Sequence, residues 1–472
     1  MQNMTLLSLG NALRQKELSC TELTNVCLKT IFQKNSELGA FLSVFSEQAL
    51  QNAVAFDARQ DPEKWGSPLA GIPFAAKDNL CYGGHATTCA SKILENFVSP
   101  YTATVLSKLE NGGAVLLGKT NMDEFGMGST CEYSALCETK NPVCSDHVPG
   151  GSSGGSAVAV ASGMAPFALG SDTGGSVRLP AAYCGLVGMR PTYGSVSRYG
   201  LVAFCSSMDT VGPLTRTVAD NRLVHACLVG KDAKDATCRD TCRGKKELQK
   251  PLRVGILSQL MTPAVSETVR QAVLSAAKRL ENTGADVEEV TICHLEDALF
   301  AYFILSSAEA SSNLARYDGV RYGKREEGRT LDALYQNSRN AGFGTEVKRR
   351  IRLGTYALTR ENKEAYYERS LAVQRALQAE FSDLFAQYDL LLCPTAPDTA
   401  PLLGQMQSPT DMYHLDLCTV PMSLCGLPAL SLPFGRDKKG LPIGLQLVGA
   451  PYSELLIYAV AEMLEGGQKD VV

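Results

Sequence analysis

The stretch Gly150–Arg178 reads GGSSGGSAVAVASGMAPFALGSDTGGSVR and decides the character of the middle of the chain. Two glycine- and serine-rich clusters, residues 150–156 and 170–178, enclose one apolar segment. Because glycines lack Cβ, backbone N–H groups can converge on one point, which is the geometry of an oxyanion hole. We therefore interpret the serines beside them as candidate nucleophiles. The alternative, a pair of flexible surface turns, explains one cluster better than two.

The same character continues on both sides of this stretch. Residues 68–213 consist of short apolar runs separated by glycine-rich turns, such as GIPFAAKDNL and GGAVLLGKTN, and we expect them to form the catalytic core. Residues 1–60 are predicted to be helices packed on that core. Ser19 and Glu22 form a potential capping box, and apolar residues follow at helical spacing: Leu23, Val26, Cys27 and Ile31.

The later part of the chain alternates predicted strands and helices. Residues 231–251 are polar and charged, which predicts a surface excursion. LRVGIL and ADVEEVTI are predicted strands on either side of a helix at Glu267–Asn282. LLLCPTAP, PALSLPFG and IGLQLVGAP predict buried strands that return to the same sheet. This alternation indicates an α/β fold.

Composition limits the class of protein. The chain has 472 residues, 45% of them hydrophobic, which is enough for a sizeable core. Its longest apolar stretches, such as Ala157–Ala161, are far shorter than the roughly 20 residues that cross a bilayer, so we expect no membrane association. A net charge of −4 argues against this chain being the main contact of a nucleic acid.

Sixteen cysteines are scattered along the chain. We expect reduced thiols in a cytoplasmic protein, because no signal peptide precedes them. The tightest groups, Cys131/Cys137/Cys144 and Cys238/Cys242, lack paired CxxC spacing, and His147 does not complete a zinc pattern. The prediction is therefore no metal site.

Lys77 is the candidate base. It closes the apolar run GIPFAAK, where a buried strand would place its amine in the interior, and burial lowers a lysine pKa enough for general-base chemistry. The alternative is a strand-end lysine that reaches water. The histidines do not lie in an obvious triad setting, and no G-x-S-x-G elbow is present.

A phosphate-loop pattern at Gly113–Thr120 is interpreted differently. The residues GAVLLGKT match G-x-x-x-x-G-K-[ST], but Ala-Val-Leu-Leu is itself a predicted strand and follows a predicted helix. We therefore do not expect nucleotide binding there.

Four stretches together resemble the amidase signature family: GIPFAAKDNL, VPGGSSGGSA, LGSDTGGSVRLPAAYCGLVGMRPTYG and SSMDTVGPLTRTVAD. The similarity covers nearly the whole chain, residues 1–472. It implies one large α/β domain, with a twisted mixed sheet of about eleven strands covered by helices on both faces. It also implies a Ser-cis-Ser-Lys triad: Ser176 as nucleophile, Ser152 after a cis peptide as proton relay, and Lys77 as base. The implied oxyanion hole is formed by backbone N–H groups of Thr173, Gly174, Gly175 and Ser176.

Further stretches are similar to the glutaminase subunits of glutamyl-tRNA(Gln) amidotransferases within that family: GKTNMDEFGMGST, TTCASKILENF, SSAEASSNLARYDGVRYG and DLCTVPMSLCGLPALSLPFG. Such subunits recognise glutamine through an arginine and an aspartate. The matching positions are Asp416 and either Arg349 or Arg350, and a guanidinium with a carboxylate suits a zwitterionic amino acid. A solvated helix face is the alternative for the arginine pair.

The resemblance implies a heterotrimer with amidotransferase B and C subunits, in which ammonia from glutamine converts Glu-tRNA(Gln), or Asp-tRNA(Asn), to the amidated form. ATP, magnesium and most tRNA contacts would belong to the partner, and this chain would need no cofactor. Leu179, Gly126 and Ser195 depart from the pattern of those glutaminases, which affects fine substrate geometry and partner contacts. The rival functions are a stand-alone amidase of small or hydrophobic amides and a non-catalytic assembly partner.

Overall fold

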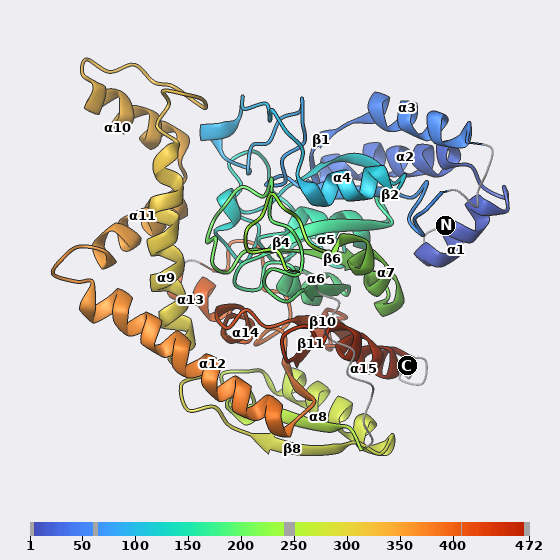
Figure 1. Cartoon of the computed structure of the whole chain (residues 1–472), viewed down its shortest axis with the longest axis vertical. Coiled ribbons are helices and arrows are strands. Elements are labelled where there is room, and N and C mark those ends of the chain that lie inside the picture. The colour runs from blue at the N-terminus through green and yellow to red at the C-terminus, as the bar shows by residue number, and fades with distance from the viewer. Residues whose placement is uncertain (1–3, 60–64, 240–250, 407, 467–472) are drawn as a thin grey trace.

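The computed structural model describes residues 4–59, 65–239, 251–406 and 408–466 (Figure 1). Eleven strands within these residues form one mixed sheet, in the order β1-β3-β2-β4-β6-β5-β10-β11-β9-β7-β8. Their bounds are β1 Phe41–Val44, β2 Pro73–Lys77, β3 Val115–Thr120, β4 Phe167–Asp172, β5 Val187–Arg190, β6 Thr210–Thr215, β7 Arg253–Leu257, β8 Asp286–Val290, β9 Leu390–Pro394, β10 Ala429–Arg436 and β11 Pro442–Gly449.

Fifteen α-helices of the described residues surround the sheet. They are α1 Leu6–Arg14, α2 Cys20–Leu38, α3 Ser46–Asp57, α4 Thr104–Asn111, α5 Gly154–Ala161, α6 Arg178–Cys184, α7 Val218–Leu228, α8 Glu267–Asn282, α9 Ala298–Asn313, α10 Leu331–Gly342, α11 Thr345–Ala357, α12 Arg369–Gln387, α13 Pro409–His414, α14 Val420–Leu424 and α15 Glu454–Gly466.

Helices cover both faces of the sheet, as predicted. Leu390 and Leu392 of β9 pack in one hydrophobic cluster with α8 and α15. The alternate residues of the same strand, Leu391 and Cys393, pack in another cluster with α9 and α12. Side chains alternate between the faces of a strand, so the two clusters lie on opposite sides of the sheet. Figure 1 shows α9, α11 and α12 grouped along one side of the molecule.

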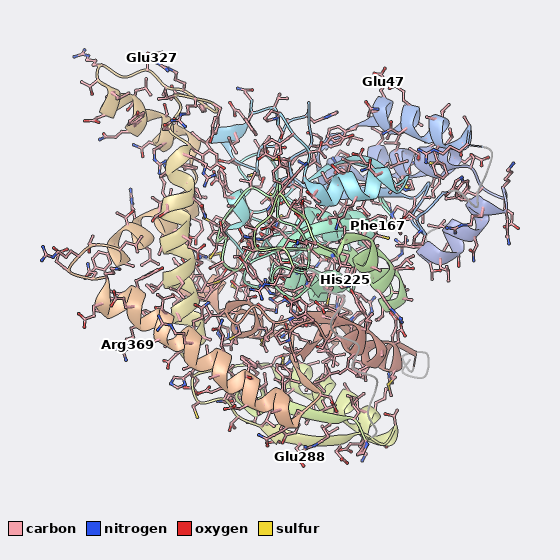
Figure 2. The ribbon with its side chains drawn as sticks, in the orientation of Figure 1. Glu47, Phe167, His225, Glu288, Glu327 and Arg369 are labelled. Carbon is pink, nitrogen blue, oxygen red and sulfur yellow. The ribbon has the colours of Figure 1, made fainter. Side chains whose placement is uncertain are left out.

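Strands inside the sheet are more deeply buried than the strand at its edge. Phe167, which begins the central strand β4, is fully buried, whereas the edge strand β8 is largely exposed and carries Asp286, Glu288 and Glu289. Figure 2 shows Phe167 in the interior and Glu288 at the periphery. Charges on an exposed edge discourage pairing with a further strand.

The predicted N-terminal helix is confirmed as α2, with the Ser19–Glu22 capping box formed. Leu23, Cys27 and Ile31 are buried, but the prediction for Val26 is wrong, because its side chain is 38% exposed. Position 26 lies at the border of the apolar face of the helix, where spacing alone does not fix burial.

The C-terminal strands return to the sheet as predicted: β10 and β11 lie between β5 and β9. The predicted helix Glu267–Asn282 is α8, and its flanking strands are β7 and β8. Of the predicted surface excursion 231–251, residues 240–250 lie outside the described residues. In the described part, Asp235 is buried and accepts a hydrogen bond from the backbone N–H of Arg198, 2.8 Å away, so this part is anchored.

The pattern GAVLLGKT is not a phosphate loop. Gly113 follows α4, and the next residues form β3, with Lys119 fully buried inside the molecule. Fifteen cysteines lie in the described residues, and all of these are free. No helix in the described residues is long and apolar enough to span a bilayer.

Candidate functional site

Lys77 lies at the centre of the site. It ends β2, whose five residues are all buried because β3 and β4 flank the strand and helices cover it. Its Nζ contacts Ser152 Oγ at 2.7 Å, Ser153 Oγ at 2.9 Å and the carbonyl oxygen of Ser171 at 3.3 Å. The alternative that this amine reaches water is excluded by its complete burial.

Burial also sets the charge of this amine. Loss of water lowers the pKa of Lys77 to about 8, against smaller opposing effects of Asp123, Cys131, Asp172 and Asp209. None of those acids forms an ion pair with Lys77 in the described residues. The neutral amine is therefore accessible near neutral pH, and a neutral amine can accept a proton.

The first glycine-serine cluster is held by Asp123. The Gly151–Ser152 peptide is cis, and the N–H of Asp123 donates to the Ser152 carbonyl oxygen at 3.2 Å. The Asp123 carboxylate accepts hydrogen bonds from the N–H groups of Cys131, at 2.9 Å, and Tyr133, at 3.0 Å. A Cβ at Gly151 would overlap this carboxylate, so the position requires glycine.

The second cluster is the turn between β4 and α6. Gly174 lies against the hydroxyl of Tyr302, and Gly175 has a φ of 149° and lies against the side chain of Thr419. A Cβ at either glycine would overlap these neighbours. The two clusters are joined directly, because the N–H of Ser153 donates to the carbonyl oxygen of Ser176 at 3.1 Å.

Buried ion pairs fix this second turn. Arg178 donates to both oxygens of Asp172 at 3.0 Å, and Arg190 donates to Asp172 Oδ1, also at 3.0 Å. Burial alone would raise the pKa of Asp172, but the two guanidinium groups hold it well below its usual value. The Thr173 hydroxyl donates to Asp209 at 2.7 Å, so both sides of the turn are anchored.

These contacts bring the predicted residues into one cluster. Lys77 contacts Ser152, and the backbone N–H of Ser153 donates a hydrogen bond to the carbonyl oxygen of Ser176. Ser176 retains slight exposure, at 7%, beside backbone amides that can face a developing negative charge. The described residues place no histidine in hydrogen-bond contact with Lys77, Ser152 or Ser176. The arrangement can therefore activate a serine hydroxyl with an amine.

Asp416 and the two predicted arginines lie in different environments. Asp416 is buried and accepts a hydrogen bond from Ser129 Oγ at 2.8 Å, and burial raises its pKa to about 7. Arg350 is buried and donates to Glu346 at 2.6 Å, while its Nη1 has no hydrogen-bond partner among the described residues. Arg349 also pairs with Glu346, but its side chain is 37% exposed.

Sequence reasoning misses several residues that shape the site. Asp123, Asp172 and Asp209 stand inside quoted motifs, yet only the fold shows that they hold the two clusters. Sequence alone does not distinguish Ser153 from Ser152, although Ser153 contacts both Lys77 and Ser171.

Known proteins of one family are similar to this chain over nearly its whole length. The family model "Amidase" matches residues 22–457. The glutamyl-tRNA(Gln) amidotransferase A subunits of Moorella thermoacetica and Prochlorococcus marinus are each 47% identical to this chain, over 98% of its length and 96% of theirs.

Solved structures agree. The glutamyl-tRNA(Gln) amidotransferase A subunit of Thermotoga maritima superposes with a TM-score of 0.80 at 39% identity, covering 99% of this chain and 95% of that one. A structure described as an amidase superposes with a TM-score of 0.83 at 30% identity, covering 98% and 99%. The predicted resemblance is thereby confirmed, and the chain belongs to the amidase family.

Proposed function

We propose that this chain is the glutaminase subunit of a tRNA-dependent amidotransferase. The observation that carries the proposal is the buried amine of Lys77 on the hydroxyl of Ser152, beside the Ser176 turn. The chain that holds this site is 47% identical to amidotransferase A subunits over almost its entire length.

In the proposed reaction, Ser176 Oγ attacks the side-chain carbonyl carbon of glutamine. Its proton passes to Ser152 Oγ as Ser152 gives its own proton to Lys77. Backbone N–H groups of residues 173–176 stabilise the oxyanion. Lys77 returns the proton to the leaving nitrogen through Ser152, ammonia departs, and water then hydrolyses the glutamyl ester to glutamate.

For substrate recognition, we infer that Arg350 rather than Arg349 binds the α-carboxylate. Arg350 is buried and has one nitrogen without a partner in the described residues, and its guanidinium is held over the ring of Phe303 at 4.4 Å. Asp416 would take the α-amino group, which would favour its ionised form. A buried arginine with an unpaired nitrogen, together with a buried acid that has no ion-pair partner in the described residues, suits the two charges of a zwitterion.

The ammonia would be used by a partner. We propose that B and C subunits complete a cytoplasmic heterotrimer, that the partner binds ATP, magnesium and most of the tRNA, and that Glu-tRNA(Gln), or Asp-tRNA(Asn), is the acceptor. This chain would act without a cofactor of its own.

The test is release of glutamate and ammonia from glutamine, compared with release from a panel of aliphatic amides, with and without co-purified partners. Preference for glutamine that is lost in Ser176→Ala, with the circular dichroism spectrum retained, is expected. Better turnover of aliphatic amides would favour the stand-alone amidase, and absence of any turnover would favour the assembly role.

A further inference from the structure

A cluster outside the catalytic site combines three kinds of metal ligand. Cys144, Asp146 and His147 place their ligand atoms within 4.8 Å of one another. Asp146 Oδ1 is 3.0 Å from Cys144 Sγ and 2.5 Å from His147 Nδ1. The sequence prediction of no metal site considered only cysteine and histidine spacing, whereas the third potential donor here is a carboxylate.

The backbone around the cluster is fixed before any ligand arrives. The N–H of His147 donates to the carbonyl oxygen of Cys144 at 3.0 Å, which closes a tight turn. His147 also forms a β-bridge with Leu402, and the N–H of Leu403 donates to the Asp146 carbonyl oxygen at 2.9 Å. Two segments distant in sequence thus hold the turn, so little ordering would accompany binding.

Access and charge also suit a cation. His147 lines a cavity of about 770 Å³ that reaches solvent, and the Asp146 side chain is 69% exposed. One thiolate and one carboxylate supply two negative charges, and a neutral imidazole supplies a third donor. Thiolate, imidazole and carboxylate are together the ligands that Zn²⁺ takes, with water in the fourth position.

We propose that Cys144, Asp146 and His147 bind a divalent transition metal of the zinc type. On binding, the Cys144 thiol loses its proton to solvent. The proton on His147 Nδ1 moves to Nε2 by exchange with solvent, so that the Nδ1 lone pair of a neutral imidazole faces the metal. The ion would stabilise the turn at residues 144–147, which packs against residues 401–403. This turn ends three residues before the first glycine-serine cluster. This proposal is independent of the glutaminase assignment.

Cobalt and zinc titrations of the purified full chain test the proposal. After chelator treatment and dialysis under reducing conditions, Co²⁺ should produce a sulfur-to-cobalt absorption band at one equivalent, and Zn²⁺ should displace it. Cys144→Ser should abolish the band, and Asp146→Asn should weaken Zn²⁺ affinity at least about tenfold. Both side chains are at least partly exposed, so circular dichroism should confirm that these variants fold.

The matched control is Cys293→Ser with His294→Ala. Cys293 is exposed, and His294 pairs with Glu380 at 2.5 Å, so this pair offers similar groups elsewhere on the surface. These variants should keep the band and the affinity. A band that persists in Cys144→Ser, that disappears in the control, or that never forms would overturn the proposal.

As a second readout, zinc should raise the melting temperature of the parent chain and of the control but not that of Cys144→Ser, because only binding to the folded state stabilises it. Equal shifts in all three proteins would contradict specific binding at this turn.

Discussion

The ends of the neighbouring strands β2 and β3 carry two lysines in different surroundings. Lys77 and Lys119 each close an apolar run, and both are fully buried. Lys119 pairs with Ala76 in the parallel register, so its side chain points to the face opposite that of Lys77. There its Nζ meets Asp78 at 3.0 Å, whereas Lys77 meets serine hydroxyls.

The difference explains why Lys77, and not Lys119, is the candidate base. A carboxylate partner compensates the buried charge of Lys119, as expected of a structural ion pair. Lys77 lacks such a partner in the described residues, and burial lowers its pKa to about 8. Both amines are buried because their strands lie inside the sheet. The two side chains point to opposite faces, and the groups on each face determine the surroundings of the amine.

Replacement of Lys77 should abolish most of the glutaminase activity. Lys77→Ala should lower kcat for glutamine at least about 10³-fold, because Ser152 then has no acceptor for its proton. Lys77→Arg should fail nearly as badly, since a guanidinium with a pKa above about 12 cannot accept a proton. Turnover is measured in the assembled complex, with His85→Ala as a control that keeps most activity. Near-normal turnover of Lys77→Ala would contradict the mechanism.

Replacement of Lys119 should lower the stability of the fold rather than the activity. Lys119→Met leaves Asp78 buried without its partner, which should lower the free energy of unfolding by about 3–5 kcal/mol in urea titrations. The double variant with Asp78→Asn should recover part of this loss. Turnover per folded molecule should change little. A catalytic defect with unchanged unfolding would instead place Lys119 in the reaction.

The carboxylates extend the contrast. Asp78 forms an ion pair with Lys119, whereas the carboxylate of Asp416 has only the Ser129 hydroxyl as hydrogen-bond partner in the described residues. If Asp416 binds the α-amino group, Asp416→Ala should raise KM for glutamine by an amount equivalent to about 1.5–3 kcal/mol. Hydrolysis of a simple amide should be much less affected. Equal losses on both substrates would indicate a structural role.

The pH profile is the finest test of the comparison. Since Lys77 must be neutral to act, and its pKa is about 8, kcat should rise about tenfold between pH 7 and 9 and then level off. Lys119→Arg keeps the structural cation and should leave this profile unchanged. A flat profile across that range, with chemistry rate-limiting, would show that Lys77 is not the titrating base.

Much of the fold could be predicted because apolar periodicity reports burial directly. It correctly indicated α8, the strands on either side of it and the return of the C-terminal strands. It did not resolve Val26, which lies at the edge of an apolar face, or the anchoring of Asp235, which depends on a contact with Arg198.

The site was less accessible to sequence reasoning. Lys119 also stands at the end of an apolar run, so its position in the sequence does not distinguish it from Lys77, and only the family motifs do. The alternation of side chains between the two faces of a strand does distinguish them, since Lys119 pairs with Ala76 rather than with Lys77. The supporting acids Asp123 and Asp209 act through partners distant in the chain or through backbone N–H groups, and such contacts leave no local pattern.

The anchoring of Arg178 has a consequence for the newly made protein. Arg178 donates to Gln446 at 2.6 Å and to the carbonyl oxygen of Thr419 at 3.0 Å, and Thr419 also packs on Gly175. Thr419 and Gln446 lie 241 and 268 residues after Arg178 in the chain. A nascent chain on the ribosome therefore carries Lys77, Ser152 and Ser176 long before the partners of Arg178 exist. We expect the turn at residues 170–178 to take its final geometry only after these partners have been synthesised.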